Sequence, residues 1–107
     1  MLSNNTYMGL RETTIQHEHV LAQLNEERVS ALVRISKTLE SLLTQLHQAH
    51  TCVAGAAGEA RAREIAKYNE LRQHAALYRW YLEVQREALG LRHHHGLDEF
   101  YKVPPAL

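Results

Sequence analysis

The chain has 107 residues, and its 12 Lys and Arg side chains balance 12 Asp and Glu side chains, so the formal net charge is zero. This length allows a single domain over residues 1–107, and an apolar fraction of 45% is typical of a folded chain. The charge balance gives no electrostatic support for nucleic-acid binding, and a lone cysteine permits no intrachain disulfide.

The N-terminal residues show no basic region followed by an apolar stretch, so we expect no signal peptide. No apolar run approaches the roughly 18 residues that a membrane span requires. We therefore expect a soluble, cytoplasmic protein with neither a membrane nor a nucleic acid as its partner.

A long first helix is predicted over about residues 13–50. Its apolar residues recur at alternating spacings of three and four, which places them on one stripe of a helix. Thr13 and Gln16 have the spacing of a capping box at the start of this helix. The predicted core positions are Leu32, Ile35, Leu39, Leu42 and Leu46.

A turn is predicted over residues 51–58, where small residues and two glycines gather. A second helix over about residues 59–89 follows, because the three-four spacing of apolar residues resumes there. Gly90 is placed as the glycine just beyond its last turn, with Leu91 positioned to complete a Schellman ending. Two long helices joined by a short turn predict an antiparallel hairpin in an all-α fold.

The C-terminal segment predicts one short helix over about residues 97–102. This helix must end before Val103, because Pro104 disfavours helical backbone in the residue that precedes it. Phe100 and Tyr101 are expected to pack this turn against the long helices.

A second apolar strip on the second helix predicts self-association. Trp80, Tyr81 and Val84 would remain exposed on an isolated hairpin, and monomers rarely tolerate such a patch. We predict a homodimer that forms a four-helix bundle. The predicted interface residues are Tyr78, Trp80, Tyr81 and Val84. A monomer closed by its C-terminal tail, with an unidentified protein as partner, is the alternative.

Eight histidines are many for a chain of this length, and several are expected near the open end of the hairpin. A turn centred near residues 54 and 55 would place His17 level with Arg92 and His19 level with Gly90. Imidazole ligands suit zinc and nickel, so a zinc or nickel site is an alternative to a purely structural role. The residues of this candidate metal site are His17, His19, His93, His94 and His95.

The spacing of these histidines matches no established metal-binding motif. His17 and His19 are two residues apart, so on a helix their side chains point in directions that differ by about 200°. The signatures Glu-x-x-His and His-Glu-x-x-His are both absent. Solvated histidines near helix ends are therefore the simpler interpretation. A second candidate set, at the turn, consists of His47, His50 and Cys52.

Motifs for nucleophilic catalysis, phosphate binding and dinucleotide binding are absent from the sequence. We therefore expect a non-enzymatic helical interaction or scaffold module without a cofactor. One alternative is a histidine-rich metal-binding or metal-responsive protein. Another is a small dimeric helical enzyme acting on an anionic small molecule. Arg28, Arg34 and Lys37 are its candidate anion-binding residues, although their spacing does not match such a site.

The segment 84–92, VQREALGLR, followed by the residues 101–104, YKVP, resembles the C-terminal signature of a family of short uncharacterised bacterial all-helical proteins. The portion from about Glu26 to Leu46 is compatible with the same family. The resemblance implies a bacterial, cytoplasmic, all-helical protein, and it assigns no catalytic role to any residue.

Overall fold

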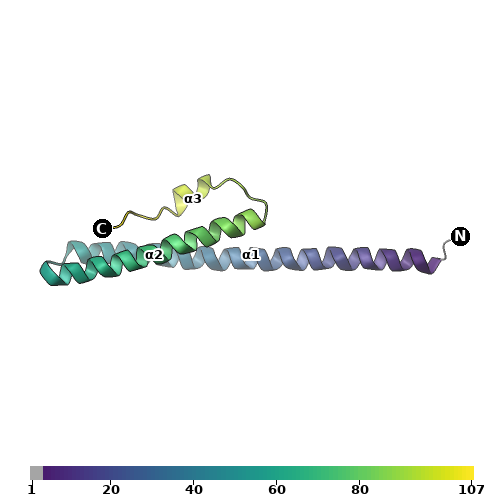
Figure 1. Ribbon diagram of the computed structural model, residues 1–107, viewed down its shortest axis with the longest axis horizontal. Helices are drawn as coiled ribbons and strands as arrows, with labels where there is room; N and C mark the ends of the chain where they lie inside the picture. The colour runs from purple at the N-terminus through teal and green to yellow at the C-terminus, as the bar shows by residue number, and fades with distance from the viewer. Residues whose placement is uncertain (1–3) are drawn as a thin grey trace.

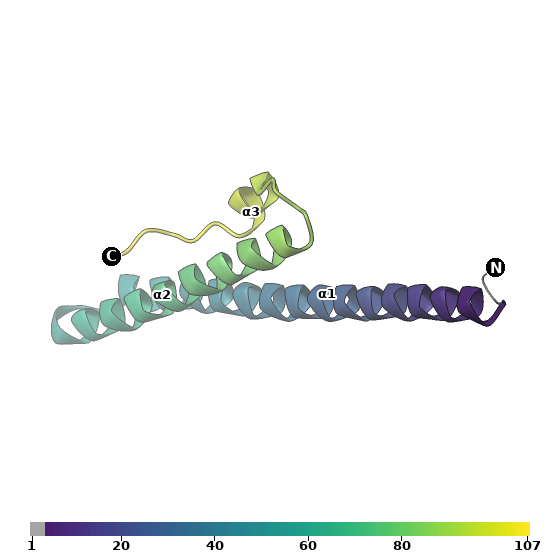
Figure 2. The same ribbon diagram turned by 45° about the vertical axis from the view of Figure 1, so that its right-hand side comes forward.

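The structure is a computed structural model that describes the backbone of residues 4–107 and the side chains of residues 13–94 and 96–107. In this part of the chain there are three helices and no strand: α1 (Asn4–Ala54), α2 (Gly58–Ala88) and α3 (His95–Phe100). The helices α1 and α2 form an antiparallel hairpin, and the chain after α2 runs back along it (Figures 1 and 2). The predicted all-α hairpin with a short C-terminal helix is confirmed.

Helix α1 is longer than predicted at both ends. It begins at Asn4 rather than at Thr13, because the residues between them include no proline and continue the helical backbone. It also continues through the segment 51–54, which composition assigned to the turn. There the Thr51 hydroxyl donates to the carbonyl oxygen one turn earlier at 3.2 Å, and Val53 is buried. Burial of Val53 favours helical backbone over a longer loop.

Helix α2 ends as the sequence predicts. The amide of Leu91 donates to the carbonyl oxygen of Arg86 at 2.9 Å, and the amide of Gly90 donates to that of Glu87 at 2.9 Å. This pair of hydrogen bonds defines a Schellman motif. Gly90 has a φ of 84°, in the left-handed region that a residue without a Cβ adopts at little cost. The predicted helix ending is therefore confirmed.

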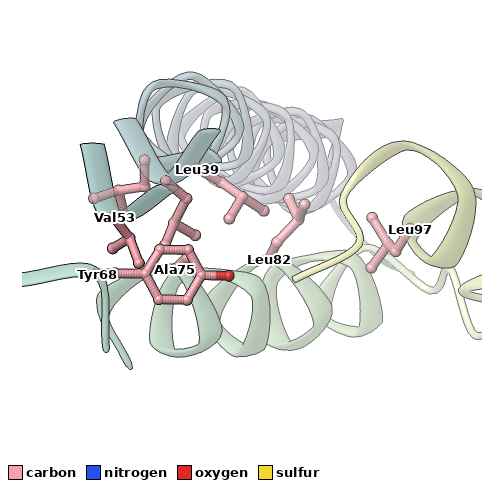
Figure 3. Close-up of a cluster of buried hydrophobic side chains, with 8 residues drawn as sticks. Leu39, Val53, Tyr68, Ala75, Leu82 and Leu97 are labelled. Carbon is pink, nitrogen blue, oxygen red and sulfur yellow. The ribbon is translucent and has the colours of Figure 1, made fainter. Parts of the chain in front are cut away.

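The core lies between α1 and α2 and continues to α3 (Figure 3). Its buried residues are Leu39, Leu42, Leu46, Val53, Tyr68, Ala75, Leu82 and Leu97. Half-buried Leu32 and Ile35 pack against this cluster, so all five predicted core positions of the first helix belong to it or contact it. No polar or charged residue is buried among the described side chains. The hairpin is therefore held together mainly by burial of apolar surface.

Helix α3 begins and ends two residues earlier than the predicted range 97–102. This position places Leu97, which is 3% exposed, in the core cluster. The backbone leaves the helix at Tyr101, whose amide still donates to the Leu97 carbonyl oxygen at 2.9 Å. Tyr101 and Val103 also pack against the core, whereas Phe100 is 77% exposed.

Polar side chains of α2 bind the backbone of the C-terminal tail, residues 101–107. Tyr68 Oη donates to the carbonyl oxygen of Pro105 at 3.2 Å, and Arg72 Nε donates to that of Pro104 at 2.7 Å. Asn69 donates to Leu107 at 3.2 Å and accepts its amide at 3.0 Å. Pro104 and Pro105 have no N–H, so their backbone offers only carbonyl oxygens. Side chains of α2 donate hydrogen bonds to both of these oxygens.

Candidate functional site

The face of α2 that points away from α1 carries four exposed apolar residues, which we call the outer face. Its members are Leu77, Trp80, Tyr81 and Val84, whose exposed fractions are 44%, 57%, 37% and 40%. At 3.6 residues per turn, they lie on the side of α2 opposite to buried Ala75 and Leu82. These fractions hold with the tail in place, so the tail does not cover the outer face.

The aromatic rings of this region contact one another. The rings of Trp80 and Tyr81 have centroids 5.6 Å apart, and Tyr81 meets Tyr78 edge to face at 5.5 Å. Tyr78 is half-buried and packs against the core cluster. Of the four predicted interface residues, Tyr78 therefore anchors the other aromatic rings from inside the hairpin, while Trp80, Tyr81 and Val84 are exposed.

Sequence reasoning missed Leu77 as a member of the outer face. Leu77 precedes Trp80 by three residues and Val84 by seven, so the three-four spacing of this second strip already included it. Arg79, beside Trp80 in the sequence, forms ion pairs with Glu83, at 3.3 Å, and with Asp98 of α3. The outer face is thus an apolar surface, and Arg79 and Glu83 next to it are paired within the chain.

His17 and His19 do not lie at the level of the residues that follow α2. Arg28 Nη1 donates to the carbonyl oxygen of Ala88 at 3.5 Å, so Arg28 marks the point on α1 that lies beside the end of α2. His17 precedes Arg28 by 11 residues, which is about 16 Å along a helix. Both histidines are exposed. They precede Arg28 on α1, whose N-terminal part extends well beyond the end of α2 (Figure 1). The register differs from the expected one, since a turn centred near residues 54 and 55 would place Leu21, and not Arg28, beside Ala88.

The histidines after α2 make local contacts. His94 is half-buried, with Nε2 at 3.2 Å from a carboxylate oxygen of Glu87. His93 is exposed and its backbone carbonyl accepts a hydrogen bond from Arg86 at 2.9 Å, whereas the side chain of His95 lies outside the described residues. Within the part of the chain that is described, no three His, Cys, Asp or Glu side chains are arranged to hold a metal ion.

The candidate anion-binding residues of α1 do not converge. Arg28 points toward the end of α2, and Arg34 and Lys37 are exposed. Arg34 and Lys37 are three residues apart and share one side of α1, whereas Arg28 lies on the side that faces α2. The geometry therefore gives no support to an active site built from these three residues.

His47 and His50, from the second candidate set, line a pocket between α1, α2 and the tail, of about 270 Å³. Cys52, the third member of that set, is exposed and does not line this pocket. Lys102 completes the basic part of its lining, and the remaining walls come from Leu43, Leu46, Tyr68 and Pro104. Sequence reasoning missed Lys102 and Tyr68, because no local pattern indicates that the tail returns to this point.

Comparison of the chain with protein-family models, with curated proteins and with solved structures finds no match. Among the described residues, no helix combines the length and the apolar character needed to cross a bilayer.

Proposed function

We propose that this chain is a non-enzymatic helical scaffold module that self-associates through the outer face of α2. The observation that carries this proposal is that Leu77, Trp80, Tyr81 and Val84 remain exposed although the tail packs against the hairpin. Contiguous exposed apolar surface is characteristic of association sites, and Trp and Tyr are enriched among residues that dominate binding energy. The ring contacts with half-buried Tyr78 restrain Trp80 and Tyr81 before binding, which lowers the entropy lost on association.

A second copy of the chain is the partner that fits this face best. In an antiparallel pairing with a two-fold axis between Trp80 and Tyr81, Leu77 of one copy lies opposite Val84 of the other, and Trp80 lies opposite Tyr81. Such self-complementarity is what an interface related by a two-fold axis requires. The absence of a charged side chain from these four positions also fits the more apolar character of homodimer interfaces.

The proposed dimer places the two α2 helices at the centre of a four-helix assembly, with one α1 on either side. Because the pairing is antiparallel, the segments of α1 that extend beyond α2 project from opposite ends. The chain alone already measures 87 × 22 × 14 Å. An elongated dimer of this kind has the form of a scaffold that presents two equivalent helical ends.

The test is the molar mass in solution of the chain and of the double variant Trp80→Glu/Val84→Glu. We expect a dimer for the chain and a mass near 12.3 kDa for the variant, because each copy would bury two unpaired carboxylates, at positions 80 and 84, against Tyr81 and Leu77 of the other copy. Phe100→Glu is the matched control, since Phe100 is 77% exposed on α3 and lies outside the outer face. A monomeric chain, or a double variant that stays dimeric, would contradict the proposal. Far-ultraviolet circular dichroism checks that all variants remain helical.

A further inference from the structure

The pocket between α1, α2 and the tail has a divided lining. Leu46 is 1% exposed, and with Leu43 and Pro104 it forms an apolar floor. His47, His50 and Lys102 are exposed and surround this floor, and no carboxylate is among the residues that line the pocket. The pocket thus has an apolar floor and a rim of three nitrogen-bearing side chains. His47 and His50 come from α1, and Lys102 comes from the tail.

The positions of the rim side chains are set by the fold. His47 and His50 are three residues apart and so share one side of α1. The ring of His50 meets the ring of buried Tyr68 edge to face, with centroids 6.1 Å apart. Tyr68 in turn donates its hydroxyl hydrogen to the Pro105 carbonyl oxygen, so Tyr68 acts as a wall of the pocket.

Hydrogen bonds fix the position of the tail both before and after Lys102. Immediately before it, Tyr101 Oη donates to a carboxylate oxygen of Glu40 at 3.0 Å. Two residues after it, the carbonyl oxygen of Pro104 accepts the 2.7 Å hydrogen bond from Arg72. The ammonium group of Lys102 therefore lies at the pocket only when the tail is packed against the hairpin.

The chemistry of this rim selects an anion. An ammonium group offers three donors and no acceptor, and an imidazole offers an N–H donor in each of its protonation states. A metal cation would meet the repulsion of the ammonium group, whereas a carboxylate would gain charge-assisted hydrogen bonds. The apolar floor additionally favours an anion that carries hydrocarbon over a fully hydrated inorganic ion.

We propose that this pocket binds a small organic carboxylate, with its hydrocarbon part on Leu43, Leu46 and Pro104 and its carboxylate among His47, His50 and Lys102. A volume of about 270 Å³ lies just below the usual range for ligand pockets, so the ligand must be small. A compact acid such as benzoate suits a pocket of this size. None of the outer-face residues lines the pocket, so this proposal is independent of self-association.

The proposal is tested by titrating the chain with benzoate, benzyl alcohol and inorganic phosphate while recording the amide and imidazole resonances by NMR. Benzoate is expected to bind and to shift the resonances of His47, His50 and Lys102. Benzyl alcohol lacks the charge and phosphate lacks the hydrocarbon, so each is expected to bind at least about tenfold more weakly.

Variants distinguish benzoate binding in the pocket from a general effect of the charge of the chain. Lys102→Ala is expected to weaken benzoate binding by roughly tenfold, whereas Lys37→Ala, which removes the same charge from an exposed position on α1, should leave it unchanged. Leu43→Phe should abolish binding by filling the pocket while it retains all three rim side chains. Thermal unfolding of each variant shows whether the hairpin remains folded.

Three results would overturn the proposal. The first is the absence of any benzoate-dependent shift at the three rim residues. The second is equal binding of benzoate and benzyl alcohol, which would make the pocket merely apolar. The third is saturable zinc binding through His47 and His50 that excludes benzoate, which would make the pocket a metal site.

Discussion

Tyr101 links the tail to α1 through its hydrogen bond to Glu40. Burial raises the pKa of the Tyr101 phenol above its ordinary value of 10.0, and the hydrogen bond and negative charge of Glu40 raise it further, against a smaller opposite effect of Ser36. Because the pKa is higher in the folded chain, the neutral phenol stabilises the fold fully below pH 10.0, and this contribution is lost as the pH rises through the folded pKa.

The variant Tyr101→Phe lacks this titration. We expect the unfolding temperature of the parent chain to fall more steeply than that of the variant as the pH rises beyond 10.0. Circular dichroism melts at closely spaced alkaline pH values measure both slopes. Identical slopes would show that the phenol of Tyr101 has the same proton affinity in the folded and unfolded chains.

Leu82 and Leu77 are a matched pair on opposite sides of α2, with exposed fractions of 1% and 44%. Truncation of Leu82 to alanine leaves a cavity in the core, so we expect Leu82→Ala to lower the free energy of unfolding by about 2–5 kcal/mol. Leu77→Ala should lower it by less than about 1 kcal/mol when both are measured in the monomeric Trp80→Glu/Val84→Glu background. Urea denaturation gives both values. Comparable losses would mean that the core does not lie on the Leu82 side of α2.

At the scale of whole elements, α1 consists of two parts with different surroundings. From residue 31 onward it packs against α2 and the tail, whereas every described side chain from 13 to 30 is exposed. Ile15, Val20, Leu21 and Leu24 are among them, with exposed fractions between 41% and 60%. A helical segment without tertiary contacts is only marginally stable in water.

We therefore expect the amide hydrogens of residues 13–24 to exchange much faster than those of residues 39–53 in the monomeric double variant. Hydrogen exchange followed by mass spectrometry resolves the two segments. Equal protection would contradict this account, because only the second segment has core contacts that must break before exchange.

The elements themselves were largely predictable from the sequence, because local patterns determine them. The three-four spacing from Leu32 to Leu46 depends only on helix periodicity and on which side is buried. The Schellman ending at Gly90 likewise depends on neighbouring residues. The start of α1 was not predictable from Thr13 and Gln16, because a capping pattern is a local preference that a continuing helix overrides.

The pocket and the course of the tail could not be predicted from local sequence patterns. The contact of Tyr68 with Pro105 joins residues 37 positions apart, and that of Tyr101 with Glu40 joins residues 61 apart. Neither spacing carries a helical or strand signature. The histidines at 17, 19 and 93–95 illustrate the same difficulty, since their expected proximity depended on the register between α1 and α2, which local spacing does not determine.

At the scale of the whole molecule, the outer face is the apolar surface of α2 that the folded hairpin leaves exposed. A core between two helices and a tail leaves the far side of α2 uncovered, and four apolar residues occupy it. Association through that side would bury them without disturbing either the tail or the pocket. Self-association through the outer face requires above all that Trp80 changes from exposed to buried as the chain dimerises.

Trp80 is the single tryptophan of the sequence, so its fluorescence reports the outer face directly. The decisive measurement is acrylamide quenching of this fluorescence across a concentration series, with Val84→Glu as the reference, because this variant retains Trp80 but places a charge in the outer face. We predict strong quenching in dilute solution, weaker quenching with blue-shifted emission as the concentration rises, and no such change in the variant. Quenching that stays strong at every concentration, whether or not the molar mass increases, would contradict association through the outer face.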